Sequence, residues 1–438
     1  MSSTIIPLLI NGIDITTTNA SLSESACLFQ PNLDNDTNRN IYAQLLRDRS
    51  EETQALIKEE ISCSGLWAEI NVADSIAIAE EVAATVTSGV LSGVAPVVRD
   101  PEAQAIVFKE PYGVVLGIAP WNAPLILGLR AIAAAVAAGN TVVFKGSEIC
   151  PRTHHLIAKL FRDAGFPQGV VNFIQHSPAD AASCFEAIVS HKAVRKCNFT
   201  GSTAVGRHIA QRAAFYLKPV TLELGGKNFA IVLEDADMEK AVDPVIFGAF
   251  LNSGQICMST DVVLVARSVE QQFRNLVRTK LSQGAQQVTE VINAKSQLRI
   301  TELVKNAMEN GAEKTTVKSG SRDLPVMIEN ITPTMDFWTQ EAFGPLLGLR
   351  AFDSEGEAVK IVNDCQYGLS GAIFSRNHMR ALKLAKMLNT GAVHINSGTV
   401  HDEPCLPHGG RKESGWGRFG AYWAFEEFLQ TKTVILHP

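Results

Sequence analysis

A cysteine in the segment Asn252-Ser-Gly-Gln-Ile-Cys-Met-Ser259 is the first candidate for chemistry. Cys257 stands among small and polar neighbours that predict a turn, whereas most structural cysteines are small buried hydrophobes. It could be a nucleophile, a ligand, half of a disulfide or filler. The other cysteines, at 27, 63, 150, 184, 197, 365 and 405, form no CxxC pair and no zinc-finger spacing with histidine. The sequence therefore predicts free thiols and no metal site.

Two other side chains could assist a reactive thiol. Prolines on both sides of Trp121-Asn122 stiffen the backbone, and an amide so held can donate to a developing oxyanion. An ordinary proline-rich loop would show the same pattern. Glu223 ends an apolar strand before Gly225-Gly226, where burial would favour the proton-bound carboxyl and make it a usable base. A lone glutamate beside glycines is more often a surface residue.

The segment Phe199-Thr-Gly-Ser-Thr-Ala-Val-Gly206 is predicted to turn from a strand into a helix. Its glycines permit close backbone approach, its hydroxyls can hydrogen-bond, and a helix N-terminus attracts phosphate. It is not the GxGxxG fingerprint, and many such turns are only structural.

Lys145 and Glu148 in the segment Phe144-Lys-Gly-Ser-Glu148 follow another apolar strand, the place where α/β sheets bind ligands. The two side chains could simply pair with each other on the surface. In a ligand site, the carboxylate of Glu148 would accept a hydrogen bond from a ribose 2′-hydroxyl and repel a 2′-phosphate. That reading favours NAD over NADP.

Strand–helix alternation must position these residues. Short apolar strands are expected as two runs on either side of Pro111-Tyr112-Gly113 within 105–120, and at 141–145, 170–174, 193–200 and 220–224. Helices are expected between them, including a single helix over 124–140. This order predicts an α/β fold with a parallel sheet covered on both faces. A second α/β unit is expected from about 226 to 415, a hairpin over 5–15 that turns at Asn11-Gly12, and a returning strand at the C-terminus.

Composition excludes several classes of protein. A chain of 438 residues predicts two or three domains, and its net charge of −6 does not suit a nucleic-acid partner. The longest apolar runs fall far short of a membrane span. The N-terminal segment lacks the basic region of a signal peptide, so a cytoplasmic location is expected.

Taken in order, the motifs PWN, KGSE, FTGSTAVG, ELGGK, NSGQICMS, EAFGP and GGRKESGWGR resemble those of the aldehyde dehydrogenase superfamily, from about residue 105 to 435. Segments such as GAVHINSGTVHDEPCLPHGG look like the branch that acts on aromatic aldehydes, including salicylaldehyde and vanillin. The resemblance implies a Rossmann-like cofactor domain over 1–225 with a return at about 415–425. It also implies a catalytic domain over 226–414 and an oligomerisation strand over 426–438, within a homodimer or homotetramer.

The resemblance also implies roles for single residues. Cys257 would attack the aldehyde and form a thiohemiacetal and then a thioester, with Asn122 on the oxyanion and Glu223 as the base that activates water. The cofactor would be NAD, with NADP as the alternative. Its expected contacts are Trp121, Lys145, Ser147, Glu148, Gly201, Ser202, Thr203, Gly206, Leu224, Gly225, Glu341 and Phe343.

Some features depart from the family pattern. The region before about residue 45 and the stretch 283–297 look short, and PHGG at 407–410 replaces a more usual PFGG. A degenerate paralogue that binds cofactor or partners without turnover is therefore the alternative hypothesis. A CoA-acylating dehydrogenase fits less well, because Glu223 supplies a base for hydrolysis.

Overall fold

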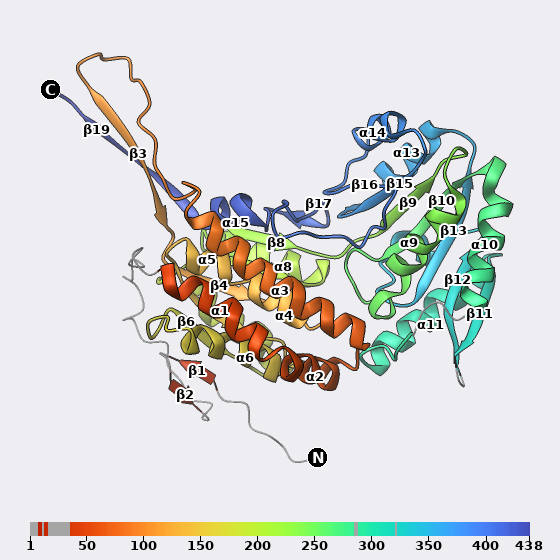
Figure 1. The fold of residues 1–438 in the computed structure, drawn as a ribbon, viewed down its shortest axis with the longest axis horizontal. Helices are drawn as coiled ribbons and strands as arrows, with labels where there is room; N and C mark the ends of the chain where they lie inside the picture. The colour runs from red at the N-terminus through yellow and green to blue at the C-terminus, as the bar shows by residue number, and fades with distance from the viewer. Residues whose placement is uncertain (1–7, 11–12, 16–35, 284–287, 320–321) are drawn as a thin grey trace.

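The computed structural model describes residues 8–10, 13–15, 36–283, 288–319 and 322–438. Two twisted sheets with helices on their faces lie side by side in this part of the chain (Figure 1). The predicted α/β fold is confirmed. Every helix in the described part is too short or too polar to span a bilayer.

The first sheet has the strand order β18-β8-β7-β4-β5-β6-β1-β2. Strands β4 to β8 are mutually parallel, whereas β1, β2 and β18 join at the edges in antiparallel pairs. The hairpin of β1 and β2 agrees with the sequence prediction, although its turn at 11–12 lies outside the described residues. The strands are β1 (Leu8–Ile10), β2 (Ile13–Ile15), β4 (Val114–Ile118), β5 (Thr141–Lys145), β6 (Val171–Ile174), β7 (Val194–Thr200), β8 (Val220–Glu223) and β18 (Gly415–Trp416).

Helices cover both faces of the first sheet. One apolar cluster joins one face to helices α1 to α6, and a second joins the other face to α7 and α8. The helices are α1 (Asp36–Asp48), α2 (Ser50–Ile61), α3 (Gly65–Val86), α4 (Pro124–Arg130), α5 (Ala133–Ala137), α6 (Pro151–Asp163), η2 (Pro178–Asp180), α7 (Ala181–Ser190) and α8 (Thr203–Phe215).

The prediction of a single helix over 124–140 is wrong, because the structure has two helices there, α4 and α5, with a break between them. The carbonyl of Ala131 accepts a hydrogen bond from the Asn198 amide at 3.0 Å. The same carbonyl packs against Gly117, where an added Cβ would lie 2.7 Å from its oxygen. An interaction with two neighbouring strands thus replaces a helical hydrogen bond, which local sequence cannot show. The break leaves Arg130 as the last residue of α4.

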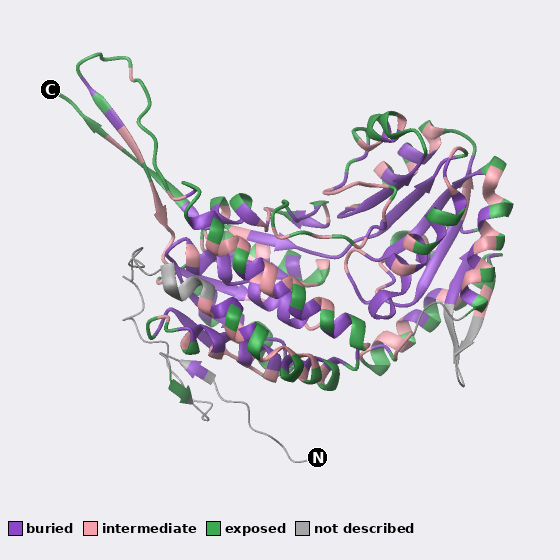
Figure 2. Cartoon of the chain, viewed as in Figure 1, coloured by how far each residue is buried: buried purple, intermediate pink, exposed green. Residues whose placement is uncertain are grey.

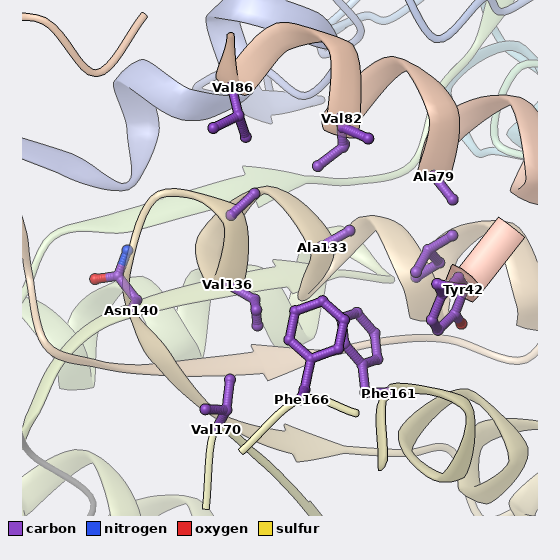
Figure 3. Close-up of a pocket in the computed structure, with 13 residues that line it drawn as sticks. Tyr42, Ala79, Val82, Val86, Ala133, Val136, Asn140, Phe161, Phe166 and Val170 are labelled. Carbon is purple, nitrogen blue, oxygen red and sulfur yellow. The ribbon is translucent and has the colours of Figure 1, made fainter. Parts of the chain in front are cut away.

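A small cavity of about 90 Å³ lies between α3, α5 and α6 (Figure 3). Val82, Val136 and Phe166 are among its lining side chains, and it is almost wholly apolar. Cavities of this kind stay dry and belong to the packed core. It lies apart from the residues with predicted chemistry.

The second sheet has the order β11-β12-β13-β10-β9-β15-β16 and is parallel except for the edge pair β11–β12. Apolar clusters lie on both of its faces, and the strands of both sheets are largely buried (Figure 2). Its strands are β9 (Asn228–Val232), β10 (Thr260–Ala266), β11 (Glu313–Ser319), β12 (Arg322–Glu329), β13 (Leu346–Phe352), β15 (Gly371–Phe374) and β16 (His394–Ile395).

The helical elements that accompany this sheet, or follow it, are α9 (Met238–Phe250), η3 (Leu251–Gly254), η4 (Arg267–Val269), α10 (Glu270–Ser282), α11 (Ala294–Glu309), α12 (Asp336–Thr339), α13 (Glu355–Asp364), α14 (His378–Ala385) and α15 (Ala421–Glu427). The chain changes sheet between β8 and β9, close to the predicted boundary at 225. β18 then returns to the first sheet. The division into domains itself stays a prediction.

Two short pairs of strands complete the fold. β14 (Tyr367–Gly368) pairs with β17 (Arg411–Lys412), and β3 (Gln104–Pro111) pairs with β19 (Leu429–Leu436) along its full length. The pair β3–β19 projects from the body as an arm with much exposed surface (Figures 1 and 2). The predicted C-terminal strand therefore exists, and its partner is β3.

Candidate active site

Four neighbouring parallel strands end at one edge of the first sheet, and predicted site residues follow each of them. In the order β5-β4-β7-β8, these residues start at Lys145, Trp121, Gly201 and Glu223. The chain runs from β4 outward through β5 and β6, and then returns to the other side of β4 as β7 and β8. The switch point therefore lies between β4 and β7, the position where open α/β sheets bind ligands.

The segment before Cys257 has an unusual backbone. Asn252, Ser253 and Gly254 have φ values of 48°, 56° and 69°, so three consecutive residues are left-handed. A Cβ on Gly254 would lie 2.2 Å from the carbonyl oxygen of Gly344, so two backbones touch there. Such a run is costly for residues with side chains and persists only when surrounding contacts enforce it. The tight turn ends α9 and places Cys257, which is half-buried, at a cavity wall.

Asn122 lies beside this turn and is fixed by it. Its side-chain amide donates to the backbone carbonyl of Gln255 at 3.0 Å. The backbone carbonyl of Asn122 accepts from Trp67 Nε1 at 2.8 Å and from the side-chain amide of Asn252 at 3.2 Å. A side-chain amide has two N–H donors, so one remains for a ligand. Asn122 and Cys257 line the same cavity, which agrees with the predicted pairing of thiol and amide.

Glu223 ends β8 and is 1% exposed. Its Oε1 lies 3.4 Å from Nε2 of His408, whereas its Oε2 has no hydrogen-bond partner among the described residues. Burial raises the pKa of the Cys257 thiol well above its ordinary value, and the charges of Glu223 and Glu341 raise it further. The thiol is thus protonated at neutral pH and needs a base to become a nucleophile.

The two glycines after Glu223 make room for the other parts of the site. A Cβ on Gly225 would lie 2.4 Å from Oε2 of Glu341, and a Cβ on Gly226 would lie 2.6 Å from the carbonyl oxygen of Cys257. The Gly226 N–H donates to Oε1 of Glu341 at 3.0 Å. Burial raises the pKa of Glu341 to about 8, although this N–H opposes the shift.

Phe343 and Trp121 meet edge to face, with ring centroids 5.9 Å apart. Phe343 has a φ of 43°, and Arg299 holds the turn before it by donating to the carbonyls of Glu341 and Ala342 at 2.7 and 2.6 Å. The EAFGP turn of the second sheet thus reaches the PWN turn of the first sheet.

A buried ion pair also holds the second sheet to the site. Lys227 Nζ lies 3.1 Å from Asp261 and 3.7 Å from the centre of the Phe337 ring. Asp261 also accepts from the N–H of Ala342 at 3.1 Å. The Gly-Gly turn and the EAFGP turn therefore share one carboxylate.

The other predicted cofactor residues lie at the same edge but contact protein atoms here. Lys145 and Glu148 pair with each other at 3.5 Å, which the sequence left as an alternative. The Ser147 hydroxyl accepts from the Ile149 N–H at 3.2 Å, and its own N–H donates to His154 at 2.8 Å. Glu148 is the most exposed of these side chains and keeps a carboxylate oxygen for a ligand.

The turn before α8 has a free helix N-terminus. Ser202 occupies the N-cap and makes no side-chain cap hydrogen bond within the described residues. Thr203 donates to the Glu413 carbonyl at 3.3 Å. Gly206 packs on Leu224, because a Cβ there would lie 2.5 Å from the leucine side chain. The first N–H groups of α8 thus face the switch point, and the residues fit a dinucleotide phosphate.

The cavity beside Cys257 has a volume of about 200 Å³ and contains residues that sequence reasoning missed. Trp67, Ile126, Leu127, Phe247, Leu251 and Val400 give it apolar walls. Arg130 and Asp402 form an ion pair in the wall, and His408 lies next to that pair. The PHGG departure was the one local signal for His408; nothing local marked the others. No cluster of three metal-ligating side chains occurs within the described residues.

The fold and site define a class: a two-sheet α/β protein with a dinucleotide-type edge and a thiol, an amide and two carboxyl groups beside it. The model of the aldehyde dehydrogenase family matches residues 40–434, and the chain belongs to that family of oxidoreductases.

Relatives and solved structures agree with this assignment. Vanillin dehydrogenase of Pseudomonas sp. (strain HR199 / DSM 7063) is 42% identical over 403 residues, which are 90% of this chain and 83% of that protein. The salicylaldehyde dehydrogenase of Pseudomonas putida G7, complexed with salicylaldehyde, superposes with a TM-score of 0.88 at 35% identity, over 92% of this chain and 85% of that one. Betaine aldehyde dehydrogenase of Staphylococcus aureus in complex with NAD+ gives 0.87 at 29% identity, over 92% and 82%.

Proposed function

We propose that this chain oxidises aromatic aldehydes to carboxylic acids with NAD, through a thioester on Cys257. The observation that carries this proposal is that Cys257 and Asn122 line one cavity, while the charge of the buried Glu223 contributes to the raised pKa of the Cys257 thiol. An apolar cavity of roughly 150 Å³ is enough to hold a benzene ring. This cavity has partly apolar walls and a volume of about 200 Å³, so it has room for one. The named activities of the vanillin and salicylaldehyde relatives support the same substrate class.

The proposed chemistry follows from the groups around the thiol. Glu223 takes the thiol proton, and Sγ of Cys257 attacks the aldehyde carbon. The free N–H of Asn122, with a backbone N–H near Cys257, holds the oxyanion. The bound nicotinamide supplies the hydride acceptor. After Glu223 has passed the thiol proton to solvent, it takes a proton from water, which attacks the thioester and releases the acid and the thiol.

NAD is the proposed cofactor because Glu148 stands at the end of β5 with an exposed carboxylate. That carboxylate repels a 2′-phosphate and accepts from a 2′-hydroxyl. Lys145, the free N-terminus of α8 and the Glu341 carboxyl would hold the ribose and phosphate groups. Trp121 and Phe343 close the edge beside them.

We also propose a homodimer or homotetramer assembled through the arm of β3 and β19. The arm exposes Phe108, Ile435 and Leu436. Val94 bridges the outer edge of β3 at Val107, whereas the outer edge of β19 pairs with no other strand among the described residues and is available to a partner strand. Light scattering on the purified chain tests this assembly; a monomer would contradict it.

Reduced-nicotinamide formation by the purified chain tests the function. Substituted benzaldehydes and aliphatic aldehydes are supplied with NAD or NADP, in parallel assays without and with CoA. Cys257→Ala should abolish turnover, whereas Cys184→Ala, at a half-buried cysteine on α7, should retain it. Turnover in Cys257→Ala would contradict the proposed nucleophile. A folded chain that binds NAD without any turnover would support the degenerate paralogue, and turnover only with CoA would support acyl transfer.

A further inference from the structure

His408 contacts the general-base candidate from a fixed position. Its Nε2 lies 3.4 Å from Oε1 of Glu223, and its Nδ1 lies 3.5 Å from Oδ1 of Asp402. The His408 backbone is paired with Phe419 by two hydrogen bonds of 2.8 Å, one in each direction. The residue is 8% exposed. Backbone pairing and burial together leave the imidazole little freedom to move away from Glu223.

Asp402 is held as an anion on the far side of this imidazole. It pairs with the buried Arg130. Burial raises the pKa of Asp402, but opposing interactions, the largest of which is with the charge of Arg130, outweigh burial and bring it below its ordinary value. Asp74, His394 and His401 are further titratable groups around this pair, and burial lowers the pKa of His394 to about 4, which keeps its ring neutral. The charged pair beside His408 is therefore Arg130 and Asp402.

The proton positions follow from the two contacts. A neutral imidazole has one N–H and one acceptor nitrogen. With Nδ1–H directed to anionic Asp402, Nε2 is an acceptor that faces Glu223. This nitrogen repels an ionised carboxylate but binds a protonated one. The attraction between Nε2 and the Glu223 carboxyl is therefore strongest after Glu223 has taken a proton. Asp402 orients the His408 ring as the aspartate of a catalytic triad orients its histidine.

The second oxygen of Glu223 faces a different environment. Oε2 is buried and lacks a hydrogen-bond partner among the described residues, whereas Oε1 is the atom near His408. A buried carboxylate oxygen without a partner is costly and is usually satisfied by water or a ligand. One oxygen is thus turned to the imidazole while the other is left for the water molecule that attacks the thioester.

We propose that His408 is a positioning residue for Glu223 and receives its proton during thioester hydrolysis. Water loses a proton to Glu223 as its oxygen bonds to the thioester carbon. Glu223 passes that proton to Nε2 of His408, the C–S bond breaks, and the Cys257 sulfur leaves as thiolate. No oxidant or reductant takes part in this step. The inference rests on the proposed function, because it requires Glu223 to act on an acyl group at Cys257.

The decay of the acyl-enzyme tests this inference separately from aldehyde oxidation. p-Nitrophenyl benzoate can acylate Cys257 directly, so the thioester forms without hydride transfer, and released p-nitrophenol measures its formation. After excess ester is removed, mass spectrometry of the intact full-length chain follows hydrolysis. His408 contacts Glu223 as an outer residue contacts a metal ligand in a metal site, where its loss typically costs about 10- to 100-fold in activity. We expect thioester hydrolysis to slow by a factor of that order in His408→Phe. The formation of the acyl-enzyme should change much less.

Matched variants separate positioning from folding. His408→Gln keeps a polar amide beside Glu223, whose oxygen can accept from the protonated carboxyl, but it cannot take up a proton. Its hydrolysis rate should therefore fall between those of the wild type and His408→Phe. His378→Gln, at an exposed histidine that begins α14, should behave as wild type. Circular dichroism and thermal melting check that each variant is folded.

Equal rates of acyl-enzyme decay in wild type and His408→Phe would overturn the inference. Equal losses of acylation and deacylation would do the same, because they would show a purely structural role. Absence of aldehyde oxidation together with normal acyl-enzyme decay in the wild type would contradict the proposed function. The comparison of decay rates between wild type and His408→Phe would still decide the role of His408. A chain whose Cys257 accepts no acyl group would count against both.

Discussion

The two sides of the candidate site are built in different ways. The strand-end edge, defined by Asn122, Lys145, Gly201 and Glu223, consists of residues that lie at or just beyond the end of a parallel strand of one sheet. The pocket wall, defined by Trp67, Arg130, Asp402 and His408, comes from a long N-terminal helix, a helix end and a loop more than 270 residues further on. The edge is ordered by sheet geometry, whereas the wall is ordered by side-chain contacts.

This difference predicts what a substitution on each side should do. Side chains at the edge extend beyond the ends of strands that hydrogen bonds already hold, so changing them should alter chemistry with little effect on folding. Wall residues hold one another, and through Asn122 they also hold the edge. Changing them should therefore alter stability as well as activity.

The largest expected effect is at the edge. Glu223→Gln removes the base but keeps the size and burial of the side chain, so thioester hydrolysis should slow by about 10² to 10⁴. Benzoylation of Cys257 should remain detectable, and the melting temperature should change little. Glu309→Gln, at an exposed position on α11, is the control and should leave both quantities unchanged. A Glu223→Gln chain that hydrolyses its thioester normally would contradict the assignment of the base.

The next effect is in the pocket wall and concerns stability. Arg130→Met leaves Asp402 buried without its cation, which should lower the free energy of unfolding by about 3–5 kcal/mol. Arg267→Met breaks a pair of similar type whose partners, Arg267 and Asp353, are 58% and 64% exposed, and should cost at most about 1 kcal/mol. Urea denaturation measures both. Similar decreases in the free energy of unfolding in the two variants would show that burial of the Arg130–Asp402 pair does not add to its contribution to stability.

A third effect concerns pH. The pKa of Glu341 is about 8 in the folded chain against an ordinary value of 4.5, so between these values the folded state binds more protons than the unfolded state. The contribution of Glu341 to stability therefore falls as pH rises through this window. Melting temperatures of the cofactor-free chain should decline less steeply in Glu341→Gln than in wild type. Parallel pH profiles would contradict the raised pKa.

The smallest expected effect tests whether the pocket wall holds the strand-end edge through Asn122. Trp67→Phe removes the hydrogen bond to the Asn122 carbonyl, which keeps its bond from Asn252, and should cost about 1 kcal/mol of stability with a measurable loss of kcat. Trp416→Phe removes an equivalent bond to the Val220 carbonyl at an exposed position. Its cost should stay within about 0.5 kcal/mol and leave kcat unchanged. Thermal melting and steady-state rates compare the two variants, and an unchanged kcat in Trp67→Phe would separate the wall from the edge.

Much of the edge could be predicted from the sequence because its signals are local. An apolar strand followed by Gly, Lys or Glu marks a strand end, and parallel strands bring their carboxyl ends together whatever lies between them. The roles of Cys257 and Glu223 were inferred from the resemblance to the aldehyde dehydrogenase superfamily and remain predictions. The structure adds that the two residues lie close enough for the carboxylate to affect the thiol.

Other features gave no local signal. The break at Ala131 depends on Asn198 and Gly117, which lie on neighbouring strands. The left-handed run at Asn252–Gly254 depends on contact with Gly344, ninety residues further on. Secondary-structure propensity depends only on the local segment. In both places a contact with another element sets the backbone conformation instead.

The sequence by itself determined the alternation of strands and helices, the sheet edge and the family. Those follow from hydrophobic period and from short motifs, which act over a few residues. Only the tertiary structure decided that Trp67, Arg130, Asp402 and His408 meet around Cys257, and that His408 faces the oxygen of Glu223. Such meetings depend on how whole layers pack, because side-chain contacts and burial are set by distances in space and not by separation along the chain.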